Sequence, residues 1–385
     1  MAPETFTTDD LVLFDAAEFD ALLTSIRASG FTPVGPVRRD EALVYDELRS
    51  AGDLPAGITD VQDNGRYRVE KRQDEAWFGF NLGPQSWKKF LLPPQFVLWR
   101  SERHENGVAF SPGSTDPPRL AFIGVRGCEL AAIAIQDRVL QTGPYPDVHY
   151  AARREGAFIV AVNCSQAGGT CFCTSMGTGP ACGAGADVVL TEILDAGHRF
   201  AATAATSRGA AVLERVATRP ATQADRDAVT RVLDQAAAGI RRQLDTNGLA
   251  AKLQANLQSP YWERVAERCL SCANCTAVCP TCFCTEVADL TDLGGEHAEH
   301  VRTWDSCFNI RFSYMHGGAV RGSRAGRYRQ WLTHKLANWQ EQFGTHGCVG
   351  CGRCITWCPA GIDLTAEAVA VSTPQASAGA PENGG

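Results

Sequence analysis

The chain has 385 residues, of which 44% are hydrophobic and 21% are charged, and its formal net charge is −7. These values indicate a globular protein of two or three domains, and an acidic chain has no general attraction to nucleic acid. No apolar run approaches the roughly 18 residues of a membrane helix. The first residues are acidic and lack the apolar core of a signal peptide.

Sixteen cysteines are an unusual number for such a chain. Proteins that owe many cysteines to disulfides are typically short and secreted. We therefore expect a cytoplasmic protein, in a reducing compartment, whose thiolates bind metal. We expect neither nucleic acid nor a membrane among its partners.

The first predicted elements are one helix and three strands. Residues 16–29 carry apolar side chains on one helical face, and Gly30 stands where a C-terminal cap belongs. Strand-like runs follow at 42–48, 66–72 and 76–82, and the middle one alternates as an exposed strand should.

A clearer unit begins at residue 120. The apolar runs 120–125 and 157–162 have the pattern of buried strands, and a helix is predicted between them, over 129–140. A crossover of this length indicates parallel strands in an α/β unit. Cys128 and Cys164 then follow the carboxyl ends of two strands, at the sheet edge where sites of open α/β folds form.

The remaining elements are a hairpin and several helices. Residues 187–193 and 198–203 have the pattern of two paired strands, helical patterns dominate 208–268, and a further helix is predicted over 324–343.

Together these elements predict the fold class and the division of the chain. We expect an N-terminal domain over 1–245, of α+β or α/β type with a partly parallel sheet. A mostly helical, ferredoxin-like domain with two [4Fe–4S] clusters should cover 246–371. The last residues, 372–385, are rich in Ser, Ala, Gly, Pro and Glu and are predicted to form a disordered tail.

Two cysteine runs in the last third of the chain are the strongest sequence evidence for what the chain binds. Each has the spacing C-x2-C-x2-C-x3-C-P, which binds [4Fe–4S] clusters in bacterial two-cluster ferredoxins. The first run consists of Cys269, Cys272, Cys275, Cys279 and Pro280, and the second run consists of Cys348, Cys351, Cys354, Cys358 and Pro359.

The two runs predict crossed ligation, because the fourth cysteine of such a run binds the other cluster. Cluster A is therefore assigned to Cys269, Cys272, Cys275 and Cys358. Cluster B is assigned to Cys348, Cys351, Cys354 and Cys279. Structural zinc is the alternative, but zinc sites typically take their cysteines in pairs.

Eight cysteines lie outside these runs, and four of them occur in a short internal repeat. Residues 170–174 read TCFCT, and residues 281–285 read the same. A third cluster is predicted on Cys128, Cys164, Cys171 and Cys173, and a weaker pattern suggests a further site on Cys282, Cys284 and Cys307.

Two other interpretations of these cysteines stay open. Free cysteine also packs well as a small apolar residue, so these thiols can belong to the core. Cys128, at a predicted helix N-terminus and near Arg126, is alternatively a redox thiol with a lowered pKa.

Seven lysine and arginine residues lie between 302 and 335. They either offset the negative charge of thiolate-bound clusters, contact an acidic partner, or form a solvated helix face. Several tryptophans in the same part of the chain are expected to shield clusters from water, which tunes the reduction potential.

Motifs for other chemistry are missing. The sequence has no G-x-x-x-x-G-K-[ST] loop, no G-x-G-x-x-G after a strand, and no serine-nucleophile elbow. No catalytic site is therefore predicted, and the chain is expected to be an electron-transfer subunit of an oxidoreductase complex.

These residues together resemble the beta subunits of soluble sulfhydrogenases, which are NAD(P)-linked [NiFe] hydrogenases, and a related iron–sulfur subunit of anaerobic sulfite reductase. The resemblance spans most of the chain. It is carried by residues 83–94, 125–140, 150–164, 170–180, 269–284, 304–308, 327–336 and 348–359.

The resemblance implies a function and partners. The chain would relay electrons between a subunit that binds FAD and NAD(P)H and the small and large subunits of a [NiFe] hydrogenase. Alternatively, it would be the related iron–sulfur subunit of an anaerobic sulfite reductase, whose partner carries sirohaem.

Two further hypotheses belong to other classes. The chain could itself reduce sulfur or disulfides, with the thiols of Cys282, Cys284 and Cys307 as its site. It could also be a scaffold whose clusters only hold the fold together.

Overall fold

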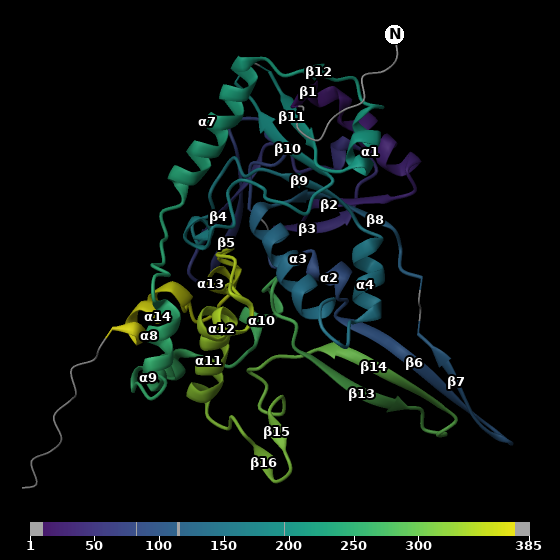
Figure 1. Cartoon of the computed structure of the whole chain (residues 1–385), viewed down its shortest axis with the longest axis vertical. Helices are drawn as coiled ribbons and strands as arrows, with labels where there is room; N and C mark the ends of the chain where they lie inside the picture. Colours follow the sequence, from purple (N-terminus) through teal and green to yellow (C-terminus); the bar gives the residue numbers. More distant parts are fainter. Residues whose placement is uncertain (1–10, 82, 114–115, 196, 374–385) are drawn as a thin grey trace, which may run out of the picture.

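The computed structural model describes residues 11–81, 83–113, 116–195 and 197–373. Figure 1 shows a large sheet with its helices at the top, the two-cluster region at the lower left, and a smaller sheet that extends to the lower right. Within the described residues, no helix combines the length and the apolar composition needed to cross a bilayer.

The large sheet has eight strands and is mixed. Its strands β2, β8, β9 and β10 are parallel neighbours, and the others pair antiparallel. Across the sheet the order is β12 (Arg219–Pro220), β1 (Val12–Asp15), β11 (Arg199–Ala204), β10 (Val188–Ile193), β9 (Phe158–Val162), β8 (Leu120–Val125), β2 (Thr32–Arg39) and β3 (Ala42–Glu47). The predicted N-terminal fold class, a domain with a partly parallel sheet, is therefore confirmed.

The helices of this part pack on the large sheet. Helix α1 contacts β2 and α6, α3 contacts β9 and α4, and α7 contacts β10. The helices are η1 (Ala16–Glu18), α1 (Phe19–Ala28), η2 (Ala51–Asp53), α2 (Lys88–Leu91), α3 (Gly127–Leu140), α4 (Val148–Glu155), α5 (Cys173–Met176), α6 (Ser207–Leu213) and α7 (Gln223–Gly239). The crossover predicted over 120–162 is confirmed, with the helix beginning two residues earlier than expected.

The strand predicted over 76–82 is wrong for the described residues of that range, since they form no strand, and residue 82 lies outside the description. Buried side chains form hydrogen bonds with the backbone N–H and carbonyl groups of this segment instead. The N–H of Phe78 donates to the Glu192 carboxylate at 2.9 Å, and its carbonyl accepts from Arg126 at 2.8 Å. A segment whose polar groups are paired in this way needs no neighbouring strand.

A four-stranded sheet joins segments that are far apart in the sequence. Its order is β13 (Thr285–Thr291), β14 (His297–Trp304), β6 (Gln95–His104) and β7 (Gly107–Pro112). Strands from both sides of residue 245 thus build one sheet, a pairing that the sequence did not predict. The domain boundaries themselves remain a prediction. Two short hairpins complete the strands: β4 (Ile58–Asp63) with β5 (Arg66–Lys71), and β15 (Tyr314–Met315) with β16 (Gly318–Ala319).

Helices dominate the two-cluster region, as predicted. They are α8 (Leu249–Ala255), α9 (Tyr261–Arg268), α10 (Asn274–Ala277), α11 (Arg324–Thr333), η3 (His334–Asn338), α12 (Trp339–Phe343), α13 (Arg353–Thr356) and α14 (Leu364–Ser372). The helix predicted over 324–343 is present but contains a π-helical turn at η3. Of the predicted tail, residues 374–385 lie outside the described residues.

A buried ion pair connects the large sheet to the two-cluster region. Arg353 in α13 donates to the Glu129 carboxylate in α3 at 2.6 Å, and the two side chains are 5% and 1% exposed. Glu129 also accepts from the hydroxyl of Tyr45 at 3.0 Å and from the indole of Trp87 at 3.1 Å. A buried charge pair is tolerated only with such additional hydrogen bonds, so this carboxylate needs its partners in place.

We predict that Glu129→Ala destabilises the protein by about 3–5 kcal/mol, because it leaves the buried Arg353 without its counter-charge. The measurement is the free energy of unfolding in denaturant, under anaerobic conditions. Glu214→Ala, at an exposed position, is the matched control. Equal unfolding free energies for the two variants would contradict the importance of this ion pair.

Candidate iron–sulfur sites

The two cysteine runs have the same backbone conformation. In the first run, Ser271 and Ala273 have φ angles of 52° and 65°. In the second run, the equivalent residues Gly350 and Gly352 have φ angles of 66° and 74°. Left-handed residues at the same two positions curl both loops alike, and each loop leads into a short helix, α10 or α13. The repeat that the spacing predicts is therefore present in the backbone.

The glycines of the second run also permit close packing. A Cβ atom on Gly350 would lie 2.7 Å from the backbone of Cys173, and one on Gly352 would lie 2.4 Å from the carbonyl oxygen of Thr170. The N–H of Phe172 donates to the carbonyl of Gly350 at 2.8 Å. The second run therefore lies directly against the segment 170–173, which carries two cysteines of the predicted third site.

The residues assigned to cluster A surround one cavity. Backbone N–H groups of Ser271 and Ile362 donate to the sulfurs of Cys269 and Cys358, each at 3.4 Å. Thiolates, apolar walls and N–H donors to sulfur are the features that hold and tune such a cluster. The lining includes Cys269, Cys272, Cys275, Cys354 and Cys358, together with Phe308, Tyr328 and Trp331. The fit is good, and the ligand set stays a prediction.

Cys279 lies among the thiols assigned to cluster B. Burial raises the pKa values of Cys348, Cys351 and Cys354, and the neighbouring Cys279 thiolate raises each of them further. Metal binding requires deprotonated thiols, so thiols of this kind release protons when a cluster binds. The neighbourhood fits the crossed assignment, in which the fourth cysteine of the first run joins the second.

Lys335 places a buried positive charge beside this group. Its Nζ donates to the Cys279 sulfur and to the Thr281 hydroxyl, both at 3.1 Å. A hydrogen bond from the Cys282 thiol lowers the pKa of Cys279, and the Lys335 ammonium lowers it further. Burial by itself would lower the pKa of Lys335, but the surrounding thiolates outweigh burial and raise it. Of the seven basic residues noted in the sequence, this one is a charge partner for a predicted ligand.

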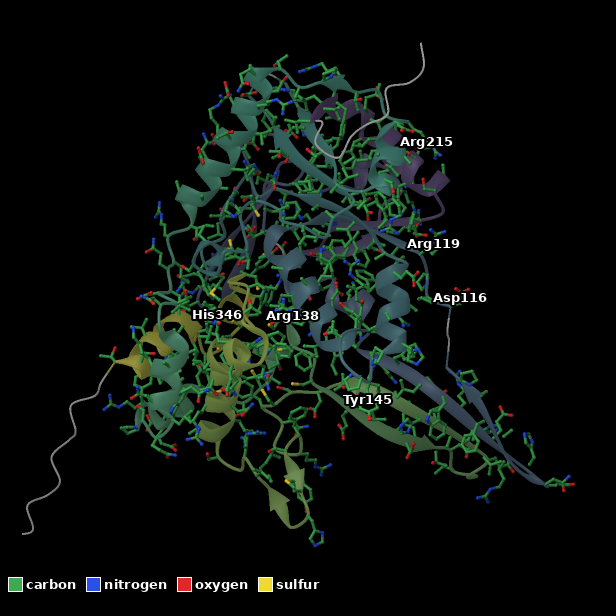
Figure 2. The ribbon with its side chains drawn as sticks, viewed as in Figure 1. Asp116, Arg119, Arg138, Tyr145, Arg215 and His346 are labelled. Carbon is green, nitrogen blue, oxygen red and sulfur yellow. The ribbon has the colours of Figure 1, made fainter. Side chains whose placement is uncertain are left out.

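The predicted third site lies where the large sheet meets the second run. Cys128 is the second residue of α3, which follows β8, and Cys164 follows β9, at the same edge of the sheet. Burial raises the pKa of Cys173 to about 12, and the charges of Cys164 and Cys351 add to this effect. In Figure 2 sulfur atoms are visible from the large sheet down into the two-cluster region.

The lowered pKa expected of Cys128 as a redox thiol is not found in the structure. Burial raises the pKa of this thiol well above its usual value, and the nearby thiolates of Cys351 and Cys173 raise it further. The Arg353 guanidinium acts in the opposite direction but does not outweigh these effects, and Arg126 donates to backbone carbonyls, including that of Asn163 at 3.3 Å.

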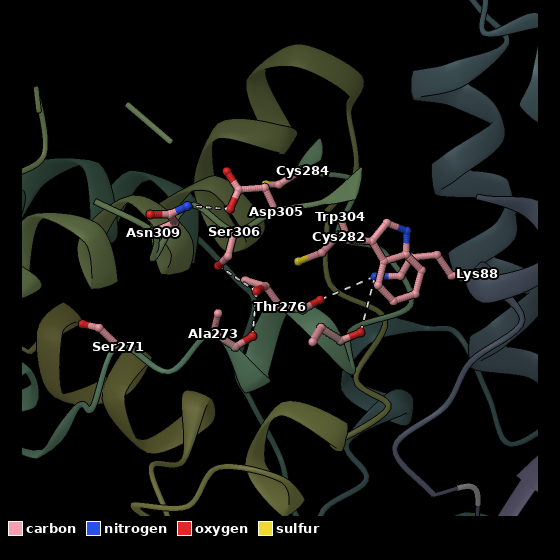
Figure 3. A pocket seen from close by; sticks show the side chains of 11 residues that line it. Lys88, Ser271, Ala273, Thr276, Cys282, Cys284, Trp304, Asp305, Ser306 and Asn309 are labelled. Carbon is pink, nitrogen blue, oxygen red and sulfur yellow. Dashed lines mark hydrogen bonds between the residues drawn. The ribbon is translucent and has the colours of Figure 1, made fainter. Parts of the chain in front are cut away.

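Cys282, Cys284 and Cys307 also come together. The Cys307 thiol donates a hydrogen bond to the sulfur of Cys284, which lowers the pKa of Cys284 to about 7. Cys282 and Cys284 line a cavity of about 400 Å³ shown in Figure 3, where the Cys282 sulfur points into the open space. Within the described part of the chain, no three His, Cys, Asp or Glu side chains are arranged to hold a single metal ion.

Lys88 is a candidate that sequence patterns do not reveal. It lies in α2, far from the cysteine runs in the sequence, yet it is buried and lines the same cavity. Its ammonium lies 3.8 Å from the centre of the Trp304 ring. A lysine is normally expected at the surface, so only the packing of α2 against the two-cluster region brings it here.

Comparisons with known proteins agree with this geometry. Residues 268–362 match the family model of the 4Fe-4S dicluster domain, which covers both cysteine runs. The subunit beta of sulfhydrogenase 2 from Pyrococcus furiosus is 31% identical over 315 residues, which cover 79% of this chain and 88% of that protein. No solved structure matches the chain.

Electron transfer is what this family implies, and the dicluster domain implies two [4Fe–4S] clusters. The match to that protein covers far more of the chain than residues 268–362, so the similarity is not confined to a common ferredoxin motif. The chain belongs to the family of sulfhydrogenase beta subunits, and it is an iron–sulfur subunit of that family.

Proposed function

We propose that this chain relays electrons within a cytoplasmic complex, between a subunit that binds FAD and NAD(P)H and the small and large subunits of a [NiFe] hydrogenase. The observation that carries the proposal is the series of neighbouring thiols, most of them buried or partly buried, that leads from the edge of the large sheet through the second run to the first run. Each bound [4Fe–4S] cluster would take up and release one electron at a time.

The ligand sets of the proposed sites follow from the thiols that lie together. Cluster A takes Cys269, Cys272, Cys275 and Cys358, which share one cavity. Cluster B takes Cys348, Cys351, Cys354 and Cys279, which are electrostatic neighbours. The same thiols explain why the two sites adjoin, since Cys354 also lines the cavity of cluster A.

A third cluster is proposed on Cys128, Cys164, Cys171 and Cys173. Support comes from the second run, because Cys351 acts on Cys128, Cys171 and Cys173. The Cys171 sulfur also lies 3.9 Å from the carbonyl oxygen of Cys351. The third site therefore adjoins cluster B, and the large sheet supplies one end of the electron path.

We predict that the anaerobically purified complex contains at least about twelve irons for this chain, four for each of the three proposed clusters. Cys272→Ser should lower this count by about four, and Cys171→Ser should also lower it, since both remove a proposed ligand. Cys182→Ser is the matched control, because its partly buried thiol is an electrostatic neighbour of Cys164 and is not assigned to the third site. The readouts are iron and sulfide analysis with electron paramagnetic resonance (EPR).

A count that Cys272→Ser leaves unchanged would contradict the assignment of cluster A. A colourless protein that contains only zinc would contradict the whole proposal. A loss in the control as large as that in Cys171→Ser would contradict the ligand set of the third cluster.

We predict that Lys335→Met lowers the reduction potential of cluster B by on the order of 100 mV, because it removes a positive charge next to a ligand sulfur. Lys335→Arg keeps the charge and should shift the potential less. The measurement is a potentiometric titration followed by EPR, which reports the cluster itself rather than activity. Equal potentials in Lys335→Met and the parent protein would show that this ammonium does not act on cluster B.

The identity of the partner distinguishes the proposed function from its nearest alternative. The match to a sulfhydrogenase subunit favours a hydrogenase over a sulfite reductase. We predict that the complex isolated through this chain contains nickel and flavin and lacks sirohaem. Metal analysis and absorption spectra of the co-purified subunits test this, and sirohaem without nickel would reverse the choice.

A further inference from the structure

We propose that Cys282, Cys284 and Cys307 bind a further [4Fe–4S] cluster through three thiolates, and that its fourth iron takes an exchangeable small anionic ligand. This inference goes beyond the electron relay proposed above and does not depend on the ligand sets of clusters A and B. It begins from the way the fold brings the three thiols together.

A strand pair brings two of these cysteines, Cys284 and Cys307, together. Strands β13 and β14 pair antiparallel with Thr285 opposite Trp304. Because Cys284 directly precedes β13, the N–H of Asp305 can donate to its carbonyl, at 2.9 Å. The turn after β14 then returns Cys307 to the sulfur of Cys284, with which it shares a hydrogen bond.

The three thiols have space beside them. All three line a second cavity, of about 390 Å³, on the side of α11 and η3. Cys282 and Cys284 also line the first cavity, so these two residues stand between the two spaces. A volume of this size is within the range of about 300–1,000 Å³ found for ligand and cofactor sites.

The surroundings carry positive charge. Lys335, buried in η3, lines the second cavity together with Arg321. On the opposite side, the anionic groups that act on the buried Lys88 are the thiolates of Cys282, Cys279 and Cys284. Two lysines therefore flank the thiols, and a negatively charged, thiolate-bound cluster would offset the cost of burying these cations.

The site also adjoins both clusters of the dicluster domain. The Cys282 thiol donates a hydrogen bond to Cys279, the residue assigned to cluster B. Cys307 is an electrostatic neighbour of Cys275, which is assigned to cluster A. Electrons could therefore reach this site from either proposed cluster.

A cubane held by cysteine alone requires four thiolates. The described residues that line the second cavity supply only three, namely Cys282, Cys284 and Cys307. The remaining iron would face the cavity with a water or hydroxide ligand. The positive lining favours a small anion at this iron, and an added thiolate would replace the water without any transfer of electrons.

Oxidation of the anaerobic complex with ferricyanide tests the open iron. Ferricyanide would accept one electron and become ferrocyanide, and the iron without a cysteine ligand would leave as Fe²⁺. We expect the EPR signal of a [3Fe–4S] cluster in the parent protein, in Cys272→Ser, which lacks a ligand of cluster A, and in the control Cys182→Ser. The signal should be absent in Cys284→Ser and Cys307→Ser, and each of these two variants should contain about four irons fewer than the parent protein.

Exchange of the fourth ligand provides a second test. Added 2-mercaptoethanol should change the EPR spectrum of the reduced protein, and the change should be absent in Cys284→Ser. If the parent protein gives no [3Fe–4S] signal, or if 2-mercaptoethanol has no effect, the proposal that one iron lacks a cysteine ligand is wrong. Iron contents of Cys284→Ser and Cys307→Ser equal to the parent value would overturn the cluster, while losses in Cys272→Ser would still support cluster A.

Discussion

The buried ion pair between Arg353 and Glu129 is the contact on which the arrangement of the sites depends. Arg353 lies inside the second cysteine run, and Glu129 directly follows Cys128 in α3. One charge pair therefore joins the loop of the second cysteine run to the helix that begins at the predicted third site. Because both side chains are almost fully buried, loss of either partner would strongly destabilise the protein. The ion pair therefore holds the loop in one position against the sheet. Arg138 of the same helix, labelled in Figure 2, adds a hydrogen bond to the carbonyl of Phe343 at 2.9 Å.

Charge balance is the second constraint. Many thiols of the chain are buried, and burial raises the pKa values of most of those whose pKa shifts. Buried thiolates need positive charge beside them, and bound iron and buried cations provide it. Lys335 and Lys88 place positive charge beside the thiols around Cys282. Lys335 lies in a π-helical turn, and Lys88 lies in the N-terminal part of the chain. π-helical turns are rare and frequently mark functional sites, which agrees with the position of Lys335.

Local patterns predicted the elements that depend on short-range sequence. The crossover over 120–162, the hairpin of β10 and β11, and the helix over 324–343 are all present, because periodicity and turn residues act within a few positions of the chain. The segment 76–82 shows where this reasoning fails. Its apolar composition is that of a strand, but Glu192 and Arg126, which are far away in the sequence, take its hydrogen bonds. The sheet that pairs β6 with β14 was missed for the same reason, since no local pattern specifies a partner about 200 residues away.

The sequence by itself determined that the chain carries two cysteine runs of the [4Fe–4S] type, because spacing is a property of the local backbone and recurs wherever that backbone forms. It also determined that Cys128 and Cys164 follow neighbouring parallel strands, because a short crossover leaves few other topologies. Only the tertiary structure decided that segment 170–173 lies against the second run, that Lys88 lies near Cys279 of the first run, and that Cys307 meets Cys284. These contacts join parts of the chain that are distant in sequence, and they form only when the large sheet and the two-cluster region pack together and exclude water from the thiols between them.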